Sequence, residues 1–279
     1  MREAEAALPA AAARESPFQP FIVEDDPAYL VVYKPPLMHT VPLRLRKQGR
    51  LDEGDAHNTT LLDWCAARFP QVLEPRGANL WEGGMVHRLD YETQGLTLAA
   101  KTQAALDWFR AQQEQGFFTK TYGGVCQKAA LIPGFPPAPA FTGAPCAVES
   151  GFRPFGPGRK AVRPALYQGR PYRTEILSAR PCQGRVFFKA RIARGFRHQI
   201  RCHLAWLGFP LHNDRLYGGA LGEGFFFYLA ALSLSFKDPR FRRLRTVSAA
   251  AAGKPRGIAR DGPCRYTGQN IFLNKRGNT

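Results

Sequence analysis

The chain lacks the features that mark membrane and secreted proteins. No apolar run reaches the roughly 18 residues that a membrane span requires, and the best candidate, residues 225–236, contains Ser233 and Ser235. The amino-terminal stretch is rich in alanine but carries acidic residues, which fits neither a secretory signal nor a transit peptide. The sequence therefore predicts a cytoplasmic protein with no membrane partner.

Metal-binding patterns are missing as well. None of the six cysteines forms a C-x-x-C pair, which argues against a zinc ribbon. His198 and His203 are five residues apart, so a helix would point them in different directions, and no H-E-x-x-H motif occurs. We therefore expect no metal site.

Acidic residues are scarce in the second half of the chain. The protein has 39 Lys and Arg against 22 Asp and Glu, a net charge of +17. Residues 153–215 hold 14 basic and 2 acidic residues, and residues 237–279 hold 11 and 2, whereas residues 1–152 carry a net charge of −3. Phenylalanine and tyrosine are interleaved with the first basic block. This pattern favours a nucleic-acid partner over a merely solvated basic surface.

Length and composition fit one large folded domain. The chain has 279 residues, of which 44% are hydrophobic and 22% charged, so it can bury a sizeable core. We expect a disordered tail over residues 1–16, a single domain over residues 17–241 and a basic, flexible tail over residues 242–279.

Strand patterns outnumber helical ones. Short runs of β-branched and aromatic residues predict strands at 29–33, 95–101, 174–178, 185–193 and 228–236, and a strand pair at 117–126. Helical periodicity occurs after a Thr59 cap up to residue 69, after a Thr102 cap over 103–115, and over 198–207. Residues 131–171 are dense in Pro and Gly and predict a long loop. These elements favour an α+β fold with a mixed, mostly antiparallel sheet and flanking helices.

Two segments hold residues that can do chemistry. The first, residues 85–96, reads M-V-H-R-L-D-Y-E-T-Q-G-L and places Asp90 in a loop before a strand. Taken alone, such an Asp is most often a turn former or a surface ion-pair partner. The second segment, residues 195–218, puts His198 and Arg201 on one face of the expected helix, which by itself could be a solvated basic face.

Together the two segments resemble the RluA-type pseudouridine synthases. That family's motifs read H-R-L-D-x-x-T-S-G-L and, roughly a hundred residues on, H-Q-I-R-x-H-L-x-x-x-G-x-P-I-x-G-D-x-x-Y-G. The sequence V-V-Y-K-P-P at residues 31–36 is similar to the family's V-x-N-K-P, and Lys120 and Tyr122 match its K-x-Y step. The resemblance spans about residues 20–238.

The chain departs from the family pattern at several positions. Gln94 replaces Ser and Asn213 replaces Gly, while Phe196 and Arg197 stand where the family more often has Arg and Thr. None of these is a position that the chemistry needs. Phe196 and Arg197 can, however, change which RNA is held.

The resemblance implies roles for individual residues. Asp90 would be the nucleophile or general base, Tyr122 would lie against the uracil, and Arg201 would pair with Asp90. Neighbouring positions imply further substrate-binding residues: His87, Arg88, Lys120, His198, Gln199 and Ile200. A carboxylate can add to C1′ of the ribose or remove a proton from the sugar, and the sequence leaves both routes open. Because the detached uracil is retained, no cofactor is implied.

The implied protein is a monomeric enzyme with the pseudouridine synthase fold and a central catalytic cleft. It would isomerise uridines in structured RNA, either rRNA or tRNA. Two alternatives stay open: a non-catalytic RNA-binding or assembly protein that keeps the fold, and a base-flipping glycosylase that releases uracil. The presence of Asp90, Tyr122 and Arg201 weighs against the first, and free uracil as the product would favour the second. The sequence does not show which uridine is modified.

Overall fold

The computed structural model describes residues 19–42, 59–77, 79–141, 143–166, 170–222 and 228–252. These ranges contain the strands β1 (Phe21–Asp25), β2 (Tyr29–Lys34), β3 (Gln94–Ala100), β4 (Thr119–Cys126), β5 (Cys146–Phe155), β6 (Ala161–Ala165), β7 (Tyr172–Cys182), β8 (Arg185–Ile192), β9 (Leu229–Lys237) and β10 (Leu244–Ser248). They also contain the helices α1 (Leu61–Ala66), α2 (Gln103–Gln115) and α3 (Gln199–Trp206). Within them, no helix is long and apolar enough to cross a membrane.

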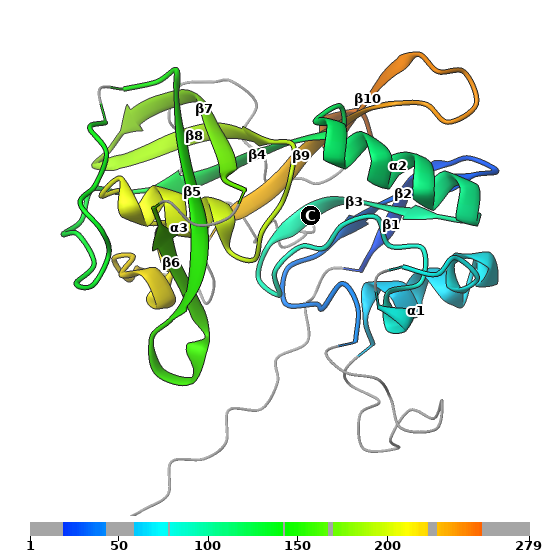
Figure 1. Cartoon of the computed structure of the whole chain (residues 1–279), viewed down its shortest axis with the longest axis horizontal. Helices are drawn as coiled ribbons and strands as arrows, with labels where there is room; N and C mark the ends of the chain where they lie inside the picture. Colours follow the sequence, from blue (N-terminus) through cyan, green and yellow to red (C-terminus); the bar gives the residue numbers. More distant parts are fainter. Residues whose placement is uncertain are drawn as a thin grey trace, which may run out of the picture.

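The strands form one sheet in the order β1-β2-β3-β9-β4-β8-β7-β5-β6, and β10 adds to β9 (Figure 1). Among the described residues, every pair of neighbouring strands is antiparallel except β3 with β9. The mixed, mostly antiparallel sheet with flanking helices confirms the predicted fold class.

Helices cover both faces of β2 and β3. Successive strand residues point to opposite faces, which is why all six residues of β2 are buried. The odd-numbered residues of β2 share a core with Phe109 of α2, whereas Leu30 and Val32 share one with Leu61 of α1. In Figure 1, α2 and α1 accordingly lie on opposite sides of these strands.

Helix α3 packs on the other half of the sheet. Its residues Ile200 and Leu204 lie in a core with Phe188 of β8, and its opposite side contacts Val162 of β6 and Tyr217. All eight residues of α3 are buried. The interpretation of this helix as carrying a solvated basic face is therefore wrong.

The two halves meet where β3 runs parallel to β9. Gln94 and Gly95 pair with Ala230 and Ala231 of β9, directly after the loop of residues 86–93, which we call the Asp90 loop. Gly95 has φ +116°, and a Cβ there would lie 2.3 Å from the Ala231 carbonyl oxygen. Only glycine permits this approach. The Asp90 loop is thereby tied closely to the central strand.

Residues 131–171 do not form the predicted long loop, because they contain β5 and β6. The first half of β5 pairs only with β7, and the second half only with β6. Pro154 and Pro164 therefore lie in strands with one open side, where a missing N–H donor is tolerated. The Pro and Gly content, read as a loop signal, hid this hairpin.

The flexible tail predicted from residue 242 onward was also wrong for its first part. Strand β10 pairs with β9 from Leu244↔Lys237 to Ser248↔Ser233, and Val247 enters the core that contains Phe236. The surrounding arginines masked this short strand in the sequence. Residues 253–279, and the tail predicted over residues 1–16, lie outside the described residues.

Smaller boundaries also differ. Helix α1 is capped by Thr60 instead of Thr59, and its capping box with Asp63 is followed by only six helical residues. The stretch 117–126 contains one strand, β4 (Thr119–Cys126), and not a strand pair. Helix α2 has the predicted bounds, between the Thr102 cap and Gly116 in the left-handed conformation.

Candidate active site

The Asp90 loop is held from outside by two buried polar residues. The Thr40 hydroxyl accepts a hydrogen bond from the Leu89 N–H at 3.1 Å and donates one to the Leu89 carbonyl oxygen at 3.0 Å. Lys34 donates from Nζ to the Tyr91 carbonyl oxygen at 3.2 Å. The backbone on each side of Asp90 is therefore fixed by Lys34, the last residue of strand β2, and by Thr40, which follows that strand.

Lys34 owes this role to its burial. It is fully buried, and its Nζ also donates to the carbonyl oxygens of Pro35 at 2.9 Å and Met38 at 2.7 Å. Burial lowers the pKa of Lys34 to about 7, although the carboxylates of Asp90 and Glu92 act in the opposite direction. Lys34 is the Lys of the V-V-Y-K-P-P motif at residues 31–36, so the sequence held a signal for it. We did not predict it as a site residue.

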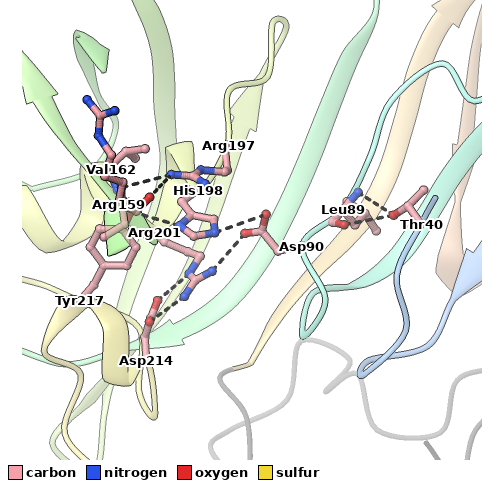
Figure 2. Close-up of polar contacts among 11 residues, drawn as sticks. Thr40, Leu89, Asp90, Arg159, Val162, Arg197, His198, Arg201, Asp214 and Tyr217 are labelled. Atoms are coloured by element: carbon pink, nitrogen blue, oxygen red, sulfur yellow. Dashed lines mark hydrogen bonds and ion pairs between the residues drawn. The ribbon is translucent and has the colours of Figure 1, made fainter. Parts of the chain in front are cut away.

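Arg201 bridges two carboxylates (Figure 2). Its Nε and Nη2 donate to the two oxygens of Asp214 at 2.8 and 2.9 Å, and its Nη1 donates to Asp90 Oδ2 at 3.3 Å. The side chains of Arg201 and Asp214 are almost completely buried, whereas that of Asp90 is 23% exposed. Desolvation lowers the pKa of Arg201, but the hydrogen bond and charge of Asp214, together with the charges of Asp90 and Glu92, more than offset this and raise it. The bidentate pair fixes the guanidinium plane, so that its remaining nitrogen faces Asp90.

His198 approaches Asp90 from a second direction. Its Nε2 lies 4.0 Å from Asp90 Oδ1, and its Nδ1 lies 3.2 Å from the Tyr217 hydroxyl. That hydroxyl accepts a hydrogen bond from the Val162 N–H at 2.9 Å, so its own proton is available for Nδ1. We therefore assign the ring proton to Nε2, facing Asp90. Burial lowers the pKa of His198 to about 4, so the ring is neutral at pH 7.

Asp90, His198 and Arg201 line one pocket together with Tyr122 of β4. Burial raises the pKa of the Tyr122 hydroxyl, and the charge of Asp90 acts in the same direction, so the phenol stays protonated. The structure thus brings together the three predicted catalytic residues. The pocket is lined by Arg88, Leu89, Asp90, Thr93, Tyr122, Ile192, Phe196, His198, Gln199, Ile200, Arg201 and Leu229.

The predicted substrate-binding residues differ in what their side chains can reach. Arg88 is largely exposed at the pocket and forms an ion pair with Glu82 at 3.2 Å. Gln199 lines the pocket, but its amide donates to Thr174 and accepts from the Phe196 N–H, so it is occupied in holding the preceding loop. Ile200 lines the pocket and also packs in the core.

His87 and Lys120 do not line the pocket. Both ring nitrogens of His87 are buried without a hydrogen-bond partner in the described structure, and the ring packs against Phe118 with centroids 5.6 Å apart. Lys120 donates from Nζ to the Ala193 carbonyl oxygen at 2.7 Å. Burial lowers the pKa of both groups, that of Lys120 to about 7. These two side chains therefore lie behind the site and not in contact with the pocket.

Asp214 and Tyr217 were absent from our predicted site residues. Both belong to the second motif, at the Asp and Tyr of G-D-x-x-Y-G, so the signal was present in the sequence. Asp214 precedes the short 3-10 helix Arg215–Tyr217, and its Oδ1 accepts a hydrogen bond from the Leu216 N–H at 3.2 Å. This turn places one residue against Arg201 and the other against His198.

The described residues contain no group of three or more His, Cys, Asp or Glu side chains that could hold a metal ion. The expectation of an enzyme without metal or cofactor stays a prediction.

Comparison with known proteins assigns the family. The family model described as RNA pseudouridylate synthase matches residues 28–206, a range that includes Asp90, Tyr122 and Arg201. The chain therefore belongs to the RNA pseudouridylate synthase family, and the resemblance to its RluA-type members is confirmed.

Two relatives and one solved structure show how close the likeness is. An uncharacterized RNA pseudouridine synthase of Chloroflexus aurantiacus is 33% identical over 159 residues, covering 57% of this chain and 45% of that protein. Ribosomal large subunit pseudouridine synthase D of Zymomonas mobilis is 28% identical over 200 residues, covering 71% and 55%. The chain thus spans about half the length of these relatives. The structure of human RNA pseudouridylate synthase domain containing 1 aligns over 83% of each chain with a TM-score of 0.56 and 21% identity, which supports the fold.

Proposed function

We propose that this protein is an RNA pseudouridine synthase that isomerises specific uridines in structured RNA, with Asp90 as the catalytic group. The observation that carries this proposal is the setting of Asp90. Its carboxylate lies in a pocket, 3.3 Å from a buried arginine whose other nitrogens are held by Asp214. A permanently charged neighbour orients a carboxylate through a charge-assisted hydrogen bond, and both candidate routes require a carboxylate that is fixed in place.

The reaction breaks the N-glycosidic bond, turns the uracil over and rejoins it to the ribose through carbon 5. In one route Asp90 adds to C1′, and in the other it removes a proton from the sugar; each begins from the ionised carboxylate. The neutral His198 turns its Nε2–H toward Asp90 Oδ1 at 4.0 Å, so it places a polar N–H beside this group without adding a second positive charge.

Tyr122 and Arg88 have different parts in this proposal. The ring of Tyr122 forms a wall of the pocket against which the uracil can stack. Its raised pKa disfavours the phenolate, so stacking is better supported than removal of the carbon-5 proton. Arg88 lies two residues before Asp90 and is more than half exposed, so it can enter the space that an extruded base leaves in a stem.

The substrate class is the finer part of the proposal. Relatives named ribosomal large subunit pseudouridine synthase D favour rRNA as the RNA to test first, with tRNA second. The proposal also includes that the protein is a monomer, acts in the cytoplasm and needs no cofactor.

The test compares Asp90→Asn with Asp107→Asn, a matched change on the exposed face of α2. Pseudouridines would be mapped in RNA from cells that lack the gene, after incubation with each purified protein. We expect Asp107→Asn to act like the wild type, and Asp90→Asn to form no pseudouridine while its Kd for RNA changes by less than about tenfold, or roughly 1.4 kcal/mol. Tyr122→Phe keeps the ring and should retain RNA binding.

Three results would contradict this proposal. Full activity of Asp90→Asn would exclude Asp90 as the catalytic group. Tight RNA binding by an inactive wild type would favour a non-catalytic binding protein, and release of free uracil would favour a glycosylase.

A further inference from the structure

Three aromatic rings cluster at the edge of the Asp90 pocket. Phe196, in the loop before α3, stacks on Phe152 of β5 with centroids 4.9 Å apart and an interplanar angle of 10°. Tyr172, the first residue of β7, lies 5.0 Å from Phe196 and 5.8 Å from Phe152. We call these three residues the aromatic shelf.

Phe196 is the member of the shelf that reaches the pocket. It lines the pocket together with Asp90 and Tyr122, and it is 37% exposed. Phe152 supports one face of the Phe196 ring. The backbone N–H of Phe196 donates to the Gln199 amide oxygen at 3.0 Å. An apolar ring that is fixed in place, exposed and next to a polar pocket is the arrangement on which nucleobases stack.

A positive charge adjoins the shelf. Arg197 is exposed, and its Nη2 donates to the backbone carbonyl oxygens of Arg159 at 2.9 Å and Ala161 at 3.2 Å (Figure 2). These carbonyls hold the guanidinium without neutralising it. The guanidinium of Arg194 lies over the Tyr172 ring, 4.9 Å from its centroid. The shelf therefore combines a stacking surface with a cation suited to a phosphate.

We propose that the aromatic shelf binds the nucleotide next to the target uridine, with its base stacked on Phe196 and its phosphate at Arg197. This inference rests on the proposed function, because it takes the pocket to hold the extruded uridine. Extruding a uridine unstacks its neighbour, and a base that loses its stacking partner gains most from an aromatic surface. The shelf would then contribute to the choice of RNA at the positions where this chain departs from its family.

The test uses hairpin RNAs that carry one uridine in the loop and 2-aminopurine as the next nucleotide, on its 5′ or its 3′ side. A matched hairpin has an abasic site in place of the 2-aminopurine. Phe196→Leu keeps an apolar side chain but removes the aromatic face, and Phe196→Tyr restores it. Phe241→Leu, at a phenylalanine that is 60% exposed outside the pocket, is the control.

We expect the wild type, Phe196→Tyr and Phe241→Leu to quench 2-aminopurine in one of the two hairpins. Phe196→Leu should not quench it, and should bind that hairpin about tenfold more weakly while binding the abasic hairpin as the wild type does. Arg197→Gln should weaken binding to both hairpins equally. It should also reduce the slope of log affinity against log salt concentration by about 1, because one counterion fewer is released.

Several outcomes would overturn the shelf. In the first, Phe196→Leu quenches 2-aminopurine as strongly as the wild type does. In the second, Phe196→Leu loses as much affinity for the abasic hairpin as for the 2-aminopurine hairpin. In the third, the wild type binds none of the hairpins. Pseudouridine formation is measured in the same samples. If pseudouridine forms normally and Phe196→Leu has no effect, only the proposed role of the aromatic shelf is refuted. If 2-aminopurine is quenched but no pseudouridine forms, only the proposed activity is refuted.

Discussion

At the scale of single residues, the site depends on a carboxylate that lies behind the reacting group. Asp214 holds Arg201 by two hydrogen bonds, and only the third nitrogen of Arg201 reaches Asp90. Replacing Asp214 removes the carboxylate that accepts two of these three hydrogen bonds from the buried guanidinium, and breaking a buried ion pair costs about 3–5 kcal/mol. Asp214 is thus a positioning residue for Asp90.

Asp214→Asn should therefore lower both stability and turnover. We expect the free energy of unfolding to fall by about 3 kcal/mol in urea denaturation, and kcat to fall at least about tenfold while the Kd for RNA stays near its original value. A merely structural role would lower stability and leave kcat of the folded fraction unchanged. Wild-type kcat in Asp214→Asn would contradict the positioning role.

Lys120 makes stability depend on pH. Its pKa falls from the ordinary value of 10.5 to about 7 in the fold, so between these values the unfolded chain binds more protons than the folded one. The free energy of unfolding contributed by Lys120 therefore rises with pH across this window, by up to about 1.4 kcal/mol per pH unit, and is lost as pH falls to 7.

Lys120→Met should remove that slope. Relative to the wild type, it should be most stable near pH 7 and lose this advantage steadily toward pH 10. The exposed Lys128→Met is the control and should keep the wild-type slope. Parallel curves for Lys120→Met and the wild type, from denaturation at several pH values, would show that Lys120 is not the cause.

At the scale of elements, the Asp90 loop has a shape that depends on residues 34–40. Thr40 supplies both hydrogen bonds to Leu89, and all these groups are buried. A second hydrogen bond joins the same two parts of the chain where the loop enters β3: the Tyr33 hydroxyl donates to the Gln94 side chain at 2.9 Å. Tyr33 and Gln94 stand where the family has Asn and Ser, so two departures from the family pattern contact each other.

Thr40→Val should loosen the Asp90 loop. The change is close in volume and leaves the Leu89 N–H buried without its partner, at a cost of about 1–3 kcal/mol. We expect a lower kcat and faster amide exchange in residues 88–91, both measured against Thr246→Val, whose hydroxyl bonds Ser235 on an exposed strand pair. Unchanged exchange in the loop would show that its other hydrogen bonds, such as that of the Met38 N–H to the Tyr91 carbonyl oxygen, are sufficient to hold it.

The sequence predicted some elements and site residues better than others, for physical reasons. Helix α2 has local start and stop signals, and its bounds were correct. The ion pair of Asp90 with Arg201 joins residues 111 positions apart, so it came from the family resemblance and not from periodicity. The direction of a side chain within a motif is set by packing, which is why His87 and Lys120 were assigned to a pocket that they do not line.

At the scale of the whole molecule, not all of the basic charge is available to RNA. On β5, β7 and β8, Arg173 pairs with Glu149 and Glu175, and Arg191 pairs with Glu175 at 2.6 Å. These carboxylates neutralise part of the basic block read from the sequence. Arg197 and the residues beyond the last strand should therefore carry a larger share of the salt dependence.

Two truncations should separate charge from folding. Deleting residues 253–279 removes six basic residues and one acidic residue and should flatten the slope of RNA affinity against salt without loss of stability. Deleting residues 242–279 also removes β10 and the buried Val247, and should lower the free energy of unfolding by about 2 kcal/mol or more. An unaltered salt slope in the shorter deletion would exclude a role for that segment in RNA binding.

Ala231 of β9 pairs with Gly95 on one side and with Tyr122 on the other. One peptide thus sets the spacing between the strand that follows Asp90 and the strand that carries Tyr122. Adjacent strands lie about 4.8 Å apart, so this spacing is specified by two ladders of hydrogen bonds and not by side chains. The consequence concerns cooperativity: the two walls of the pocket cannot separate without breaking the central ladder. The amides of Ala230 and Ala231 should therefore exchange only through global unfolding, as the slowest class in the protein.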